Sequence, residues 1–505
     1  MKKEKRMLVL AIVLLMVFSL NACSRQGPQM ATELRYGFYS EPATLDPLSP
    51  SNTADGRSLL FNVFEGLVKP TADGSFKMCI AESVVMAESG RVYRFKLREN
   101  VRFHDGSLVT SADVLYSLET AKAAGFIGFD RIQTIEADEE NVVCVRLEHP
   151  DPEFLPYLTV GIVKADSVNR DKNAIGTGPY YIESYTVQQS LVLRKFADYW
   201  QGSPSPKETP SLDKITIVFF ADPNGIILGL HGGSIDGATL FSGHAHQFNP
   251  ERFDIVPDYS AAVQLLALNN AAAPLDDIRV RQAINYGVDI QEIIDAAFYG
   301  QGMPSGSPLI PGLAAYYEQA LVNPYPLDPA KARALLAEAG YGDGGRQLSL
   351  EITVPSIYSM HVDTAQVIAG QLAKIGINVS IQLVDWAAWL SDVYFGRAYQ
   401  ATIISLDSPI VSPKGFLSRY HSGDTSNFIN FASADFDRIY DAILVEMDEG
   451  KRIALYKEAQ RVISANAASV YIQDILGFQI FRAGAYSGAV SYPLYVIDFA
   501  SIRGK

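Results

Sequence analysis

The chain has 505 residues, which is too long for one hydrophobic core and predicts roughly two to four domains. Hydrophobic residues account for 48% and charged residues for 19%, so the composition favours a globular body over a disordered chain or a protein that crosses the membrane many times. The 56 acidic and 42 basic side chains give a net charge of -14, which repels phosphate backbones and argues against nucleic acid as a partner.

The amino terminus has the pattern of an export signal. A lysine-rich start precedes an apolar run at 7–20, which is too short to favour a permanent membrane span. The run continues as Leu-Asn-Ala-Cys-Ser and resembles a bacterial lipobox, although Asn21 is uncommon at its place. We therefore predict a signal peptide at 1–22, a lipidated Cys23 and a polar tether at 23–33, which would anchor the protein to the extracytoplasmic side of a bacterial cell membrane. An ordinary signal peptide with a chance cysteine is the alternative.

In the first half of the chain, apolar and polar residues alternate in several segments, as they do in strands with one buried face. The alternation predicts strands at 34–39, 93–97, 142–147, 191–194 and 215–220. A helix is expected at about 56–64, and another begins at Thr110 or Ser111, either of which can cap it.

Near the middle, the period of the apolar residues changes. The short apolar run at 263–268 suits a buried strand. Asp276 and Asp277 then supply a cap and negative charge at a helix start, and apolar residues recur at helical spacing from Ile278 to Phe298. We expect the chain to cross here from one half of the protein to the other, with a strand leading into one amphipathic helix.

The second half alternates between the two periods. Helices are predicted at 329–339, 362–375, 386–395, 436–447 and 452–465. Strands are predicted at 348–354, 379–383 and 401–406, and a strand-rich tail follows the last helix. This order indicates a mixed or parallel sheet with covering helices, so the fold class is α/β.

Two cysteines besides Cys23 are present, Cys79 and Cys144. An exported protein meets an oxidising compartment, so a disulfide between them is one possibility. Each lies among apolar residues, however, where a buried free thiol is common. We favour free cysteines and expect no metal at either.

The usual sequence motifs of enzymes are absent. The chain has no GxxxxGK[ST], HExxH or GxSxG, and Tyr181 stands where a dinucleotide loop after Gly176 and Gly178 needs its third glycine. This absence is weak evidence by itself, and our prediction of a protein that is not an enzyme and has no cofactor rests on the family resemblance given below.

A group of histidines is the nearest approach to a metal site. His244 and His246 are two residues apart, with His231 nearby, so two imidazoles could share a metal. No carboxylate or cysteine stands at ligand spacing, and surface-loop histidines are the favoured interpretation.

Further stretches of the sequence carry a family resemblance. In chain order they read YRFKLRENVRFHDGSLVTSADVLYSL, GTGPY, ADYWQG, LDKITI, LDDIRVRQAINYGVD, DPAKARALLAEAG, QLAKIGINV, VDWAAWL and GFLSRYHS. Together they resemble the extracytoplasmic solute-binding proteins of ABC importers, in the family that carries oligopeptides, dipeptides and nickel (family 5). The resemblance covers nearly all of the chain after the predicted signal peptide, and it is specific for the family rather than for a ligand.

The resemblance implies a two-lobed, periplasmic-binding-protein-like α/β fold of type II, with an extra strand-rich subdomain on the first lobe. The implied ranges are 34–69, 174–267 and 479–505 for lobe I, 70–173 for the subdomain, and 268–478 for lobe II. A monomer would bind its solute between the lobes, close on it, and deliver it to the permease and ATPase subunits.

The resemblance also suggests ligand-binding residues. In peptide-binding members, an acidic residue just after a strand of the second lobe pairs with the free amine of the peptide, in a motif similar to Asp-Tyr-Pro-Asp-Pro. The sequence SLDSPIVSPKGFL matches this motif in part through Asp407, and lacks its second acid. Asp407 as the cap of a turn is the alternative. Trp386 and Trp389 share a helical face; we expect Trp389 in the core, and we assign Trp386 and Tyr39 to the ligand.

Two other functions stay open. A nickel or metal-chelate-binding member of the same family would use His231, His244 and His246. A lipoprotein that signals or acts as a chaperone without import belongs to a different class. A genome neighbourhood with two permeases and two ATPases would favour import.

Overall fold

The computed structural model describes residues 30–505, except 40, 53, 72–73, 140, 166, 203–208, 343, 409–411 and 493–495. The predicted signal peptide at 1–22 and the lipidation of Cys23 lie outside the described residues. Within the described ranges, no helix has the length and apolar character needed to cross a membrane.

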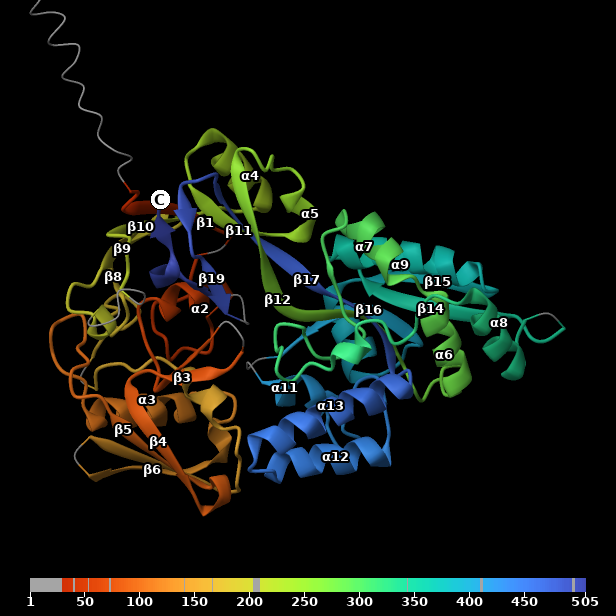
Figure 1. The fold of residues 1–505 in the computed structure, drawn as a ribbon, viewed down its shortest axis with the longest axis horizontal. Coiled ribbons are helices and arrows are strands. Elements are labelled where there is room, and N and C mark those ends of the chain that lie inside the picture. The colour runs from red at the N-terminus through yellow and green to blue at the C-terminus, as the bar shows by residue number, and fades with distance from the viewer. Residues whose placement is uncertain are drawn as a thin grey trace, which may run out of the picture.

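One large mixed sheet extends through both halves of the molecule (Figure 1). Its strands, in spatial order, are β15 (Ile377–Val384), β14 (Leu348–Pro355), β16 (Ala401–Asp407), β12 (Phe253–Leu268), β17 (Ser469–Arg482), β11 (Gly237–Phe241), β1 (Glu33–Phe38), β10 (Lys214–Phe219), β9 (Ser190–Lys195) and β8 (Tyr180–Thr186), with β13 (Met303–Pro304) paired to β17. The strands predicted at 34–39, 191–194, 215–220, 348–354, 379–383 and 401–406 belong to this sheet, and the run predicted at 263–268 is the end of a much longer strand.

The strands β12 and β17 join the two halves. They pair with each other antiparallel along most of their length, while β11 pairs with β17 on the side of lobe I and β16 pairs with β12 on the side of lobe II. The pairing shifts register between Tyr259 and Val263, and again between Gln264 and Leu265. Register shifts of this kind bend a strand pair, so we expect a bend at these positions of the crossing strands.

The subdomain is a separate antiparallel sheet with one helix. Its strands in spatial order are β4 (Ala81–Ala87), β5 (Val92–Leu97), β7 (Val142–Leu147) and β6 (Ile132–Glu139). The helix α3 (Ser111–Ala123) begins with a capping box, in which Thr110 and Asp113 bond to each other's backbone N–H groups. The alternation of buried and partly exposed residues along β7 is the pattern that predicted it.

Helices cover the sheets. Those of lobe I are α2 (Ala54–Phe61), α4 (Pro223–Gly232) and α5 (Ser242–Ala245). Those of lobe II are α6 (Ile278–Gly287), α7 (Ile290–Phe298), α8 (Pro329–Glu338), α9 (Ser359–Ala373), α10 (Trp386–Ala388) with a π-helical continuation (Trp389–Phe395), α11 (Pro413–Leu417), α12 (Ala434–Val445) and α13 (Glu449–Ala465).

Short elements complete the chain. Small strand pairs are β2 (Val68–Pro70) with β3 (Phe76–Met78), β18 (Tyr486–Ser487) with β21 (Arg503–Gly504), and β19 (Val490–Tyr492) with β20 (Val496–Asp498). Single 3-10 turns lie at Glu88–Gly90, Phe129–Arg131, Leu155–Thr159, Trp200–Gly202, Gln319–Leu321, Ser418–Tyr420 and Phe499–Ser501.

The single helix predicted from Ile278 to Phe298 is wrong in one respect, because it consists of two helices. Val288 has extended backbone angles and ends α6. The Asp289 carboxylate then accepts the N–H groups of Gln291 and Glu292, so it caps a new helix. The cap breaks a run whose apolar spacing alone reads as continuous.

The cores agree with the expected burial. Trp389 is buried in lobe II among aromatic and aliphatic side chains, as predicted. Cys79 and Cys144 are both free thiols, so the favoured interpretation is confirmed and a disulfide between them is not. The Cys79 thiol is buried and donates to Glu65 Oε1 at 3.4 Å, and burial, ahead of the charge of Glu65, raises the pKa of this thiol.

Candidate ligand-binding site

The carboxyl ends of three parallel strands in lobe II meet at one edge of the sheet. β14 runs parallel to β15 along its whole length and parallel to β16 over a shorter stretch. Their last residues, Pro355, Val384 and Asp407, are each followed by a helix: α9, α10 and α11. In open α/β sheets ligands bind outside the carboxyl ends of the strands. This edge is therefore the candidate site on lobe II.

Asp407 is the acidic residue at that edge. It is exposed, and its neighbour in the register is Ala262 of β12, so the end of β16 points toward lobe I. Its backbone carbonyl accepts a hydrogen bond from Arg419 Nη2 at 2.8 Å. The side chain that caps α11 is Ser412, which accepts the N–H of Lys414. The carboxylate of Asp407 is thus exposed at the carboxyl end of β16.

Aromatic rings lie at the same edge. Trp386 is 37% exposed and stacks on the buried Trp389, with ring centroids 5.1 Å apart and planes at 7°. The indole N–H of Trp389 donates to Thr402 Oγ1 at 2.9 Å, which fixes the supporting ring. Tyr358, just after β14, meets Trp386 edge to face at 5.7 Å. The sequence interpretation missed Tyr358, which stands one residue before a helix and has no motif of its own.

On lobe I, Tyr39 follows the last residue of β1. Its ring is partly buried and packs against the cluster of apolar side chains that α4, β11 and β17 share. Tyr39 is thus at the end of the strand that lies next to β11, on the lobe I side of the crossing strands. Asp407 and Trp386 lie on lobe II, so the structure places Tyr39 on the other lobe from these two residues.

A buried polar network lies on the crossing strands and was not foreseen. Gln264 of β12 and Gln473 of β17 are fully buried, and Gln473 Nε2 donates to Gln264 Oε1 at 2.8 Å. Gln264 Nε2 in turn lies 3.0 Å from His361 Nδ1 and donates to Thr364 Oγ1 at 3.1 Å. Burial lowers the pKa of His361 to about 4, so the ring is neutral and its Nδ1 accepts from the amide. Two glutamines in otherwise apolar runs were the available signal.

The three histidines of the metal alternative pack in different ways. His231 stacks on Phe248 with planes at 7° and contacts Phe253 edge to face. His246 stacks on Tyr299 with centroids 3.9 Å apart. Burial and the neighbouring His246 lower the pKa of His244. Across the described part of the chain, no group of three or more His, Cys, Asp or Glu side chains is arranged to hold a metal ion.

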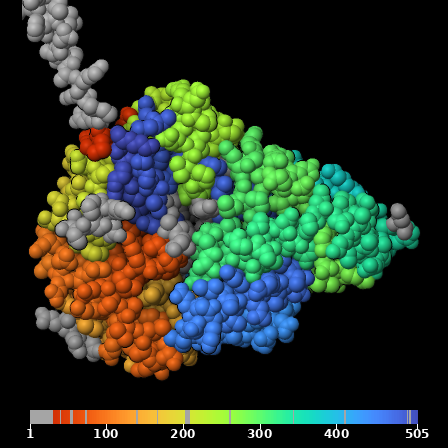
Figure 2. Space-filling view, viewed as in Figure 1, coloured from red at the N-terminus to blue at the C-terminus, as the bar shows by residue number. Residues whose placement is uncertain are grey.

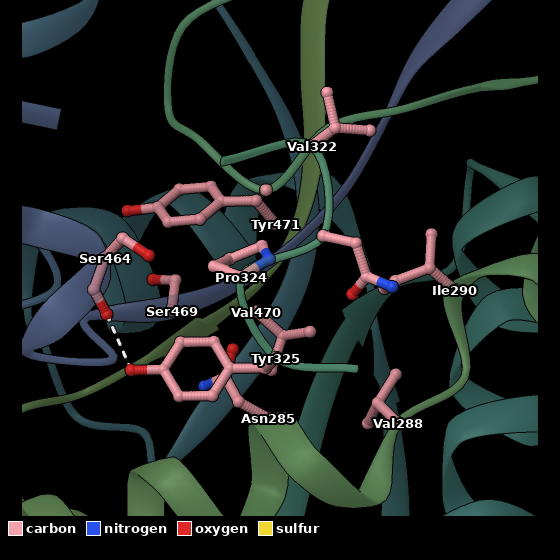
Figure 3. A pocket seen from close by; sticks show the side chains of 12 residues that line it. Asn285, Val288, Ile290, Val322, Pro324, Tyr325, Ser464, Ser469, Val470 and Tyr471 are labelled. Atoms are coloured by element: carbon pink, nitrogen blue, oxygen red, sulfur yellow. Dashed lines mark hydrogen bonds between the residues drawn. The ribbon is translucent and has the colours of Figure 1, made fainter. Parts of the chain in front are cut away.

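A small cavity lies inside lobe II (Figure 3). It lies between α6, the end of α13, β17 and the loop that carries Pro324 and Tyr325, and the Tyr325 hydroxyl donates to the Ser464 carbonyl at 2.7 Å. Its volume of about 20 Å³ holds about one water molecule. The cavity is therefore too small for a peptide or a chelate.

Residues 75–428 match the model of the bacterial extracellular solute-binding proteins, family 5, and the chain belongs to this family. It is 27% identical over 447 residues to the heme-binding protein A of Haemophilus influenzae, which covers 79% of each chain. It is also 27% identical over 446 residues to the glutathione-binding protein GsiB of Salmonella typhi, which covers 83% of this chain and 84% of the relative.

Solved structures agree with the fold. The unliganded open form of the periplasmic murein tripeptide-binding protein MppA superposes with a TM-score of 0.82 at 20% identity, over 94% of this chain and 97% of the other. The predicted family and the predicted two-lobed α/β fold class are confirmed. The protein is an extracytoplasmic solute-binding protein of an ABC importer and not an enzyme.

Proposed function

We propose that the protein captures short peptides with a free amino group between its lobes and delivers them to the permease of its importer. The observation that carries this proposal is the exposed carboxylate of Asp407 at the carboxyl end of β16, beside the crossing strand β12. A relative named for binding glutathione and a neighbour named for binding a murein tripeptide support a peptide-like ligand.

The chemistry of the edge fits such a ligand. An ammonium group enclosed between two lobes needs a carboxylate, because an unpaired buried charge costs several kcal/mol. Trp386 offers a partly exposed indole face, held by Trp389 beneath it, against which an apolar side chain of the peptide would pack. We assign the amine to Asp407, an adjacent side chain to Trp386, and a contact from lobe I to Tyr39.

Binding would proceed by lobe closure about β12 and β17. We propose the ranges predicted from the sequence as the moving units: lobe I (34–69, 174–267 and 479–505), the subdomain (70–173) and lobe II (268–478). The register shifts between Tyr259 and Leu265 lie a few residues before the proposed boundary at 267/268. The working unit is a monomer, because one chain supplies both sides of the site.

The rival ligand, nickel or a metal chelate, would need His231, His244 and His246 to turn toward it. The packing of His231 and His246 against aromatic rings supports the peptide proposal instead. A lipoprotein that signals or acts as a chaperone has no observation in its favour on the described residues.

Titration calorimetry of ligand-stripped protein tests the proposal. Asp407→Asn should weaken the binding of a free tripeptide by on the order of 2 to 5 kcal/mol and leave an amino-acetylated tripeptide less affected. Glu458→Gln, which removes an exposed carboxylate from α13, is the matched control and should bind like the wild type. Equal affinity in wild type and Asp407→Asn would remove Asp407 from the site. A reversal in which the His244→Ala, His246→Ala double variant loses Ni²⁺ binding would support the rival.

We also propose that residues 1–22 are removed on export, that Cys23 is lipidated, and that residues 23–33 form the tether to the membrane. Cys23→Ala should release the protein from washed membranes into the soluble fraction. A variant that stays in the membrane fraction would point to an uncleaved apolar segment instead.

A further inference from the structure

The subdomain and lobe II are in contact at a second place in the molecule. The subdomain residues of this contact are far from Asp407 in the sequence, whereas part of the lobe II side follows Asp407 directly. The loop after β7 carries Asp151 and Glu153, while α11 carries Lys414 and α13 carries Arg452. Figure 2 shows the surface of the subdomain, in orange, against the surface of the lobe II helices, in blue. This contact is separate from the crossing strands β12 and β17.

Two ion pairs bridge the contact. Lys414 Nζ lies 2.8 Å from Asp151 Oδ2, and the two side chains are 8% and 6% exposed. Arg452 Nε lies 3.3 Å from Glu153 Oε1, and both side chains are 9% exposed. The hydroxyl of the buried Tyr456, also on α13, donates to Glu153 Oε2. Each carboxylate belongs to the subdomain and each cation to lobe II, so all four charges are buried by the contact between them.

Neighbouring groups complete the contact. Arg131, which is in the subdomain, places Nη1 2.6 Å from Asp151 Oδ2, so Asp151 keeps one cationic partner when lobe II moves away. The Phe76 ring packs against the apolar clusters of both parts. Burial raises the pKa of Glu153 and lowers the pKa of Lys414, which is the mark of charges taken out of water.

The physics of buried charges makes this contact reversible. The desolvation of an ion pair roughly cancels its attraction, so an intact buried pair adds little net free energy. Removing one partner leaves the other charge buried without compensation. Inside a single core that charge stays out of water unless the protein unfolds. At a contact between two parts, the charge becomes hydrated when the parts separate.

The contact is also linked to the candidate ligand site through the chain. Asp407 ends β16, and Lys414 lies in the first turn of α11, the next helix. The Arg419 side chain, just after α11, donates to the Asp407 carbonyl. A ligand that binds Asp407 and a subdomain that pairs with Lys414 therefore both contact the same short segment of lobe II.

We propose that the pairs Asp151–Lys414 and Glu153–Arg452 form an ionic latch that holds the subdomain against lobe II. The latch goes beyond the proposed function, because it depends on the two-part architecture and not on the ligand being a peptide. In the absence of ligand the latch sets how often the subdomain and lobe II separate.

Amide hydrogen exchange of the purified protein without ligand tests the latch. Lys414→Met should raise the exchange rates of 151–154 and of α13 by about tenfold, because these segments become exposed when the parts separate. Lys414→Arg keeps the charge and should restore the rates. Glu153→Gln is the second variant and should raise the exchange rates of the same segments. It replaces Lys414→Met in the test if that variant does not fold.

Lys69→Met is the matched control. Lys69 pairs with Asp498 at 3.0 Å with both side chains 8% exposed, but both residues belong to lobe I. Because this variant lowers the free energy of unfolding of the whole protein, the comparison is made on the amides of 151–154 and α13 that exchange by local opening, and the rates of these amides should be unchanged. The proposal is overturned if Lys414→Met and Glu153→Gln exchange like the wild type at the contact. It is also overturned if Lys69→Met raises the exchange rates at the contact as much as these two variants do. Because no ligand is present, a failure of peptide binding does not affect the result.

Discussion

Two buried lysine–aspartate pairs, one inside lobe I and one between the subdomain and lobe II, look alike in geometry and differ in surroundings. Lys69 and Asp498 lie 3.0 Å apart, and Lys414 and Asp151 lie 2.8 Å apart, with all four side chains at most 8% exposed. Burial works to lower the pKa of both lysines. Nearby acidic groups outweigh it for Lys69, whose pKa is raised, whereas for Lys414 burial prevails, aided by the charge of Arg131.

The difference teaches how a buried charge serves either a permanent fold or a movable contact. Around Lys69, the rings of Phe61 and Tyr492 add cation–π contacts at 4.8 and 5.9 Å, and the Tyr492 hydroxyl donates to Asp498. The Asp151 carboxylate instead has two cations, one from each side of the contact. A pair whose desolvation is outweighed by surrounding favourable interactions suits a permanent core. A pair whose desolvation and attraction nearly cancel suits a contact that opens.

The largest expected effect follows from breaking the permanent pair. Lys69→Met leaves the Asp498 carboxylate buried without a counter-charge and should lower the free energy of unfolding by about 3 to 5 kcal/mol. Urea denaturation followed by far-UV circular dichroism measures the loss. The double variant Lys69→Met, Asp498→Leu should recover most of it. A single variant as stable as the wild type would contradict the assigned role of the charge.

The second largest effect is expected at two histidines, the partly buried His104 of the subdomain and the buried His361 of lobe II. His104 Nδ1 accepts the Gly176 N–H at 3.2 Å and its Nε2 donates to the Gly178 carbonyl at 3.0 Å, so the ring binds as the neutral form. Burial lowers the pKa of His104 and of His361 to about 4. A lowered histidine pKa gives stability that is present above about pH 6.5 and is lost as pH falls toward 4.

Each histidine should therefore cost about 2 kcal/mol of stability between about pH 7 and pH 5. Urea denaturation at the two pH values measures the change. His104→Phe and His361→Phe should each remove part of the pH dependence, whatever they do to the stability at neutral pH. An unchanged difference between the two pH values in both variants would show that other groups cause it.

Local patterns predicted the elements that depend on near neighbours. The strand predicted at 142–147 agrees with β7 at both ends, because its alternation is unbroken and a turn bounds it on each side. The start of α6 after Asp277 was also predictable, since a capping aspartate precedes apolar residues at helical spacing. The break at Asp289 was missed, because Val288 and Ile293 continue the same spacing and only the backbone shows that Asp289 is a cap.

The candidate site shows the same limit. Asp407 could be proposed from a motif because family resemblance preserves position along the chain. The pairing of Lys414 with Asp151, and of Gln264 with His361, joins residues that lie far apart in the sequence. Such pairs depend on how the parts pack, and a single sequence with no alignment carries no local pattern for them.

A smaller effect on stability is expected at the latch than at the permanent pair. Lys414→Met should lower the free energy of unfolding by about 1 kcal/mol, because Asp151 keeps Arg131 and can return to water when the contact opens. The same urea denaturation that measures Lys69→Met measures this variant. A loss as large as that of Lys69→Met would mean that the contact cannot open, and the comparison of the two pairs would fail.

The smallest effect is expected at an ion pair that no core encloses. Arg461 Nη1 lies 2.6 Å from Glu318 Oε2 on the surface of lobe II, and the arginine side chain is 52% exposed. Because solvent screens such a pair and two long side chains must be ordered to form it, Arg461→Gln should lower the free energy of unfolding by about 0.5 kcal/mol or less. The distance between the charged atoms is shorter here than in either buried lysine–aspartate pair, so distance alone would predict that this pair contributes most to stability. Urea denaturation of Arg461→Gln beside Lys414→Met therefore tests whether distance or burial decides how much an ion pair stabilises the protein. A loss of stability in Arg461→Gln that matches or exceeds the loss in Lys414→Met would show that distance decides it, and not burial by the subdomain.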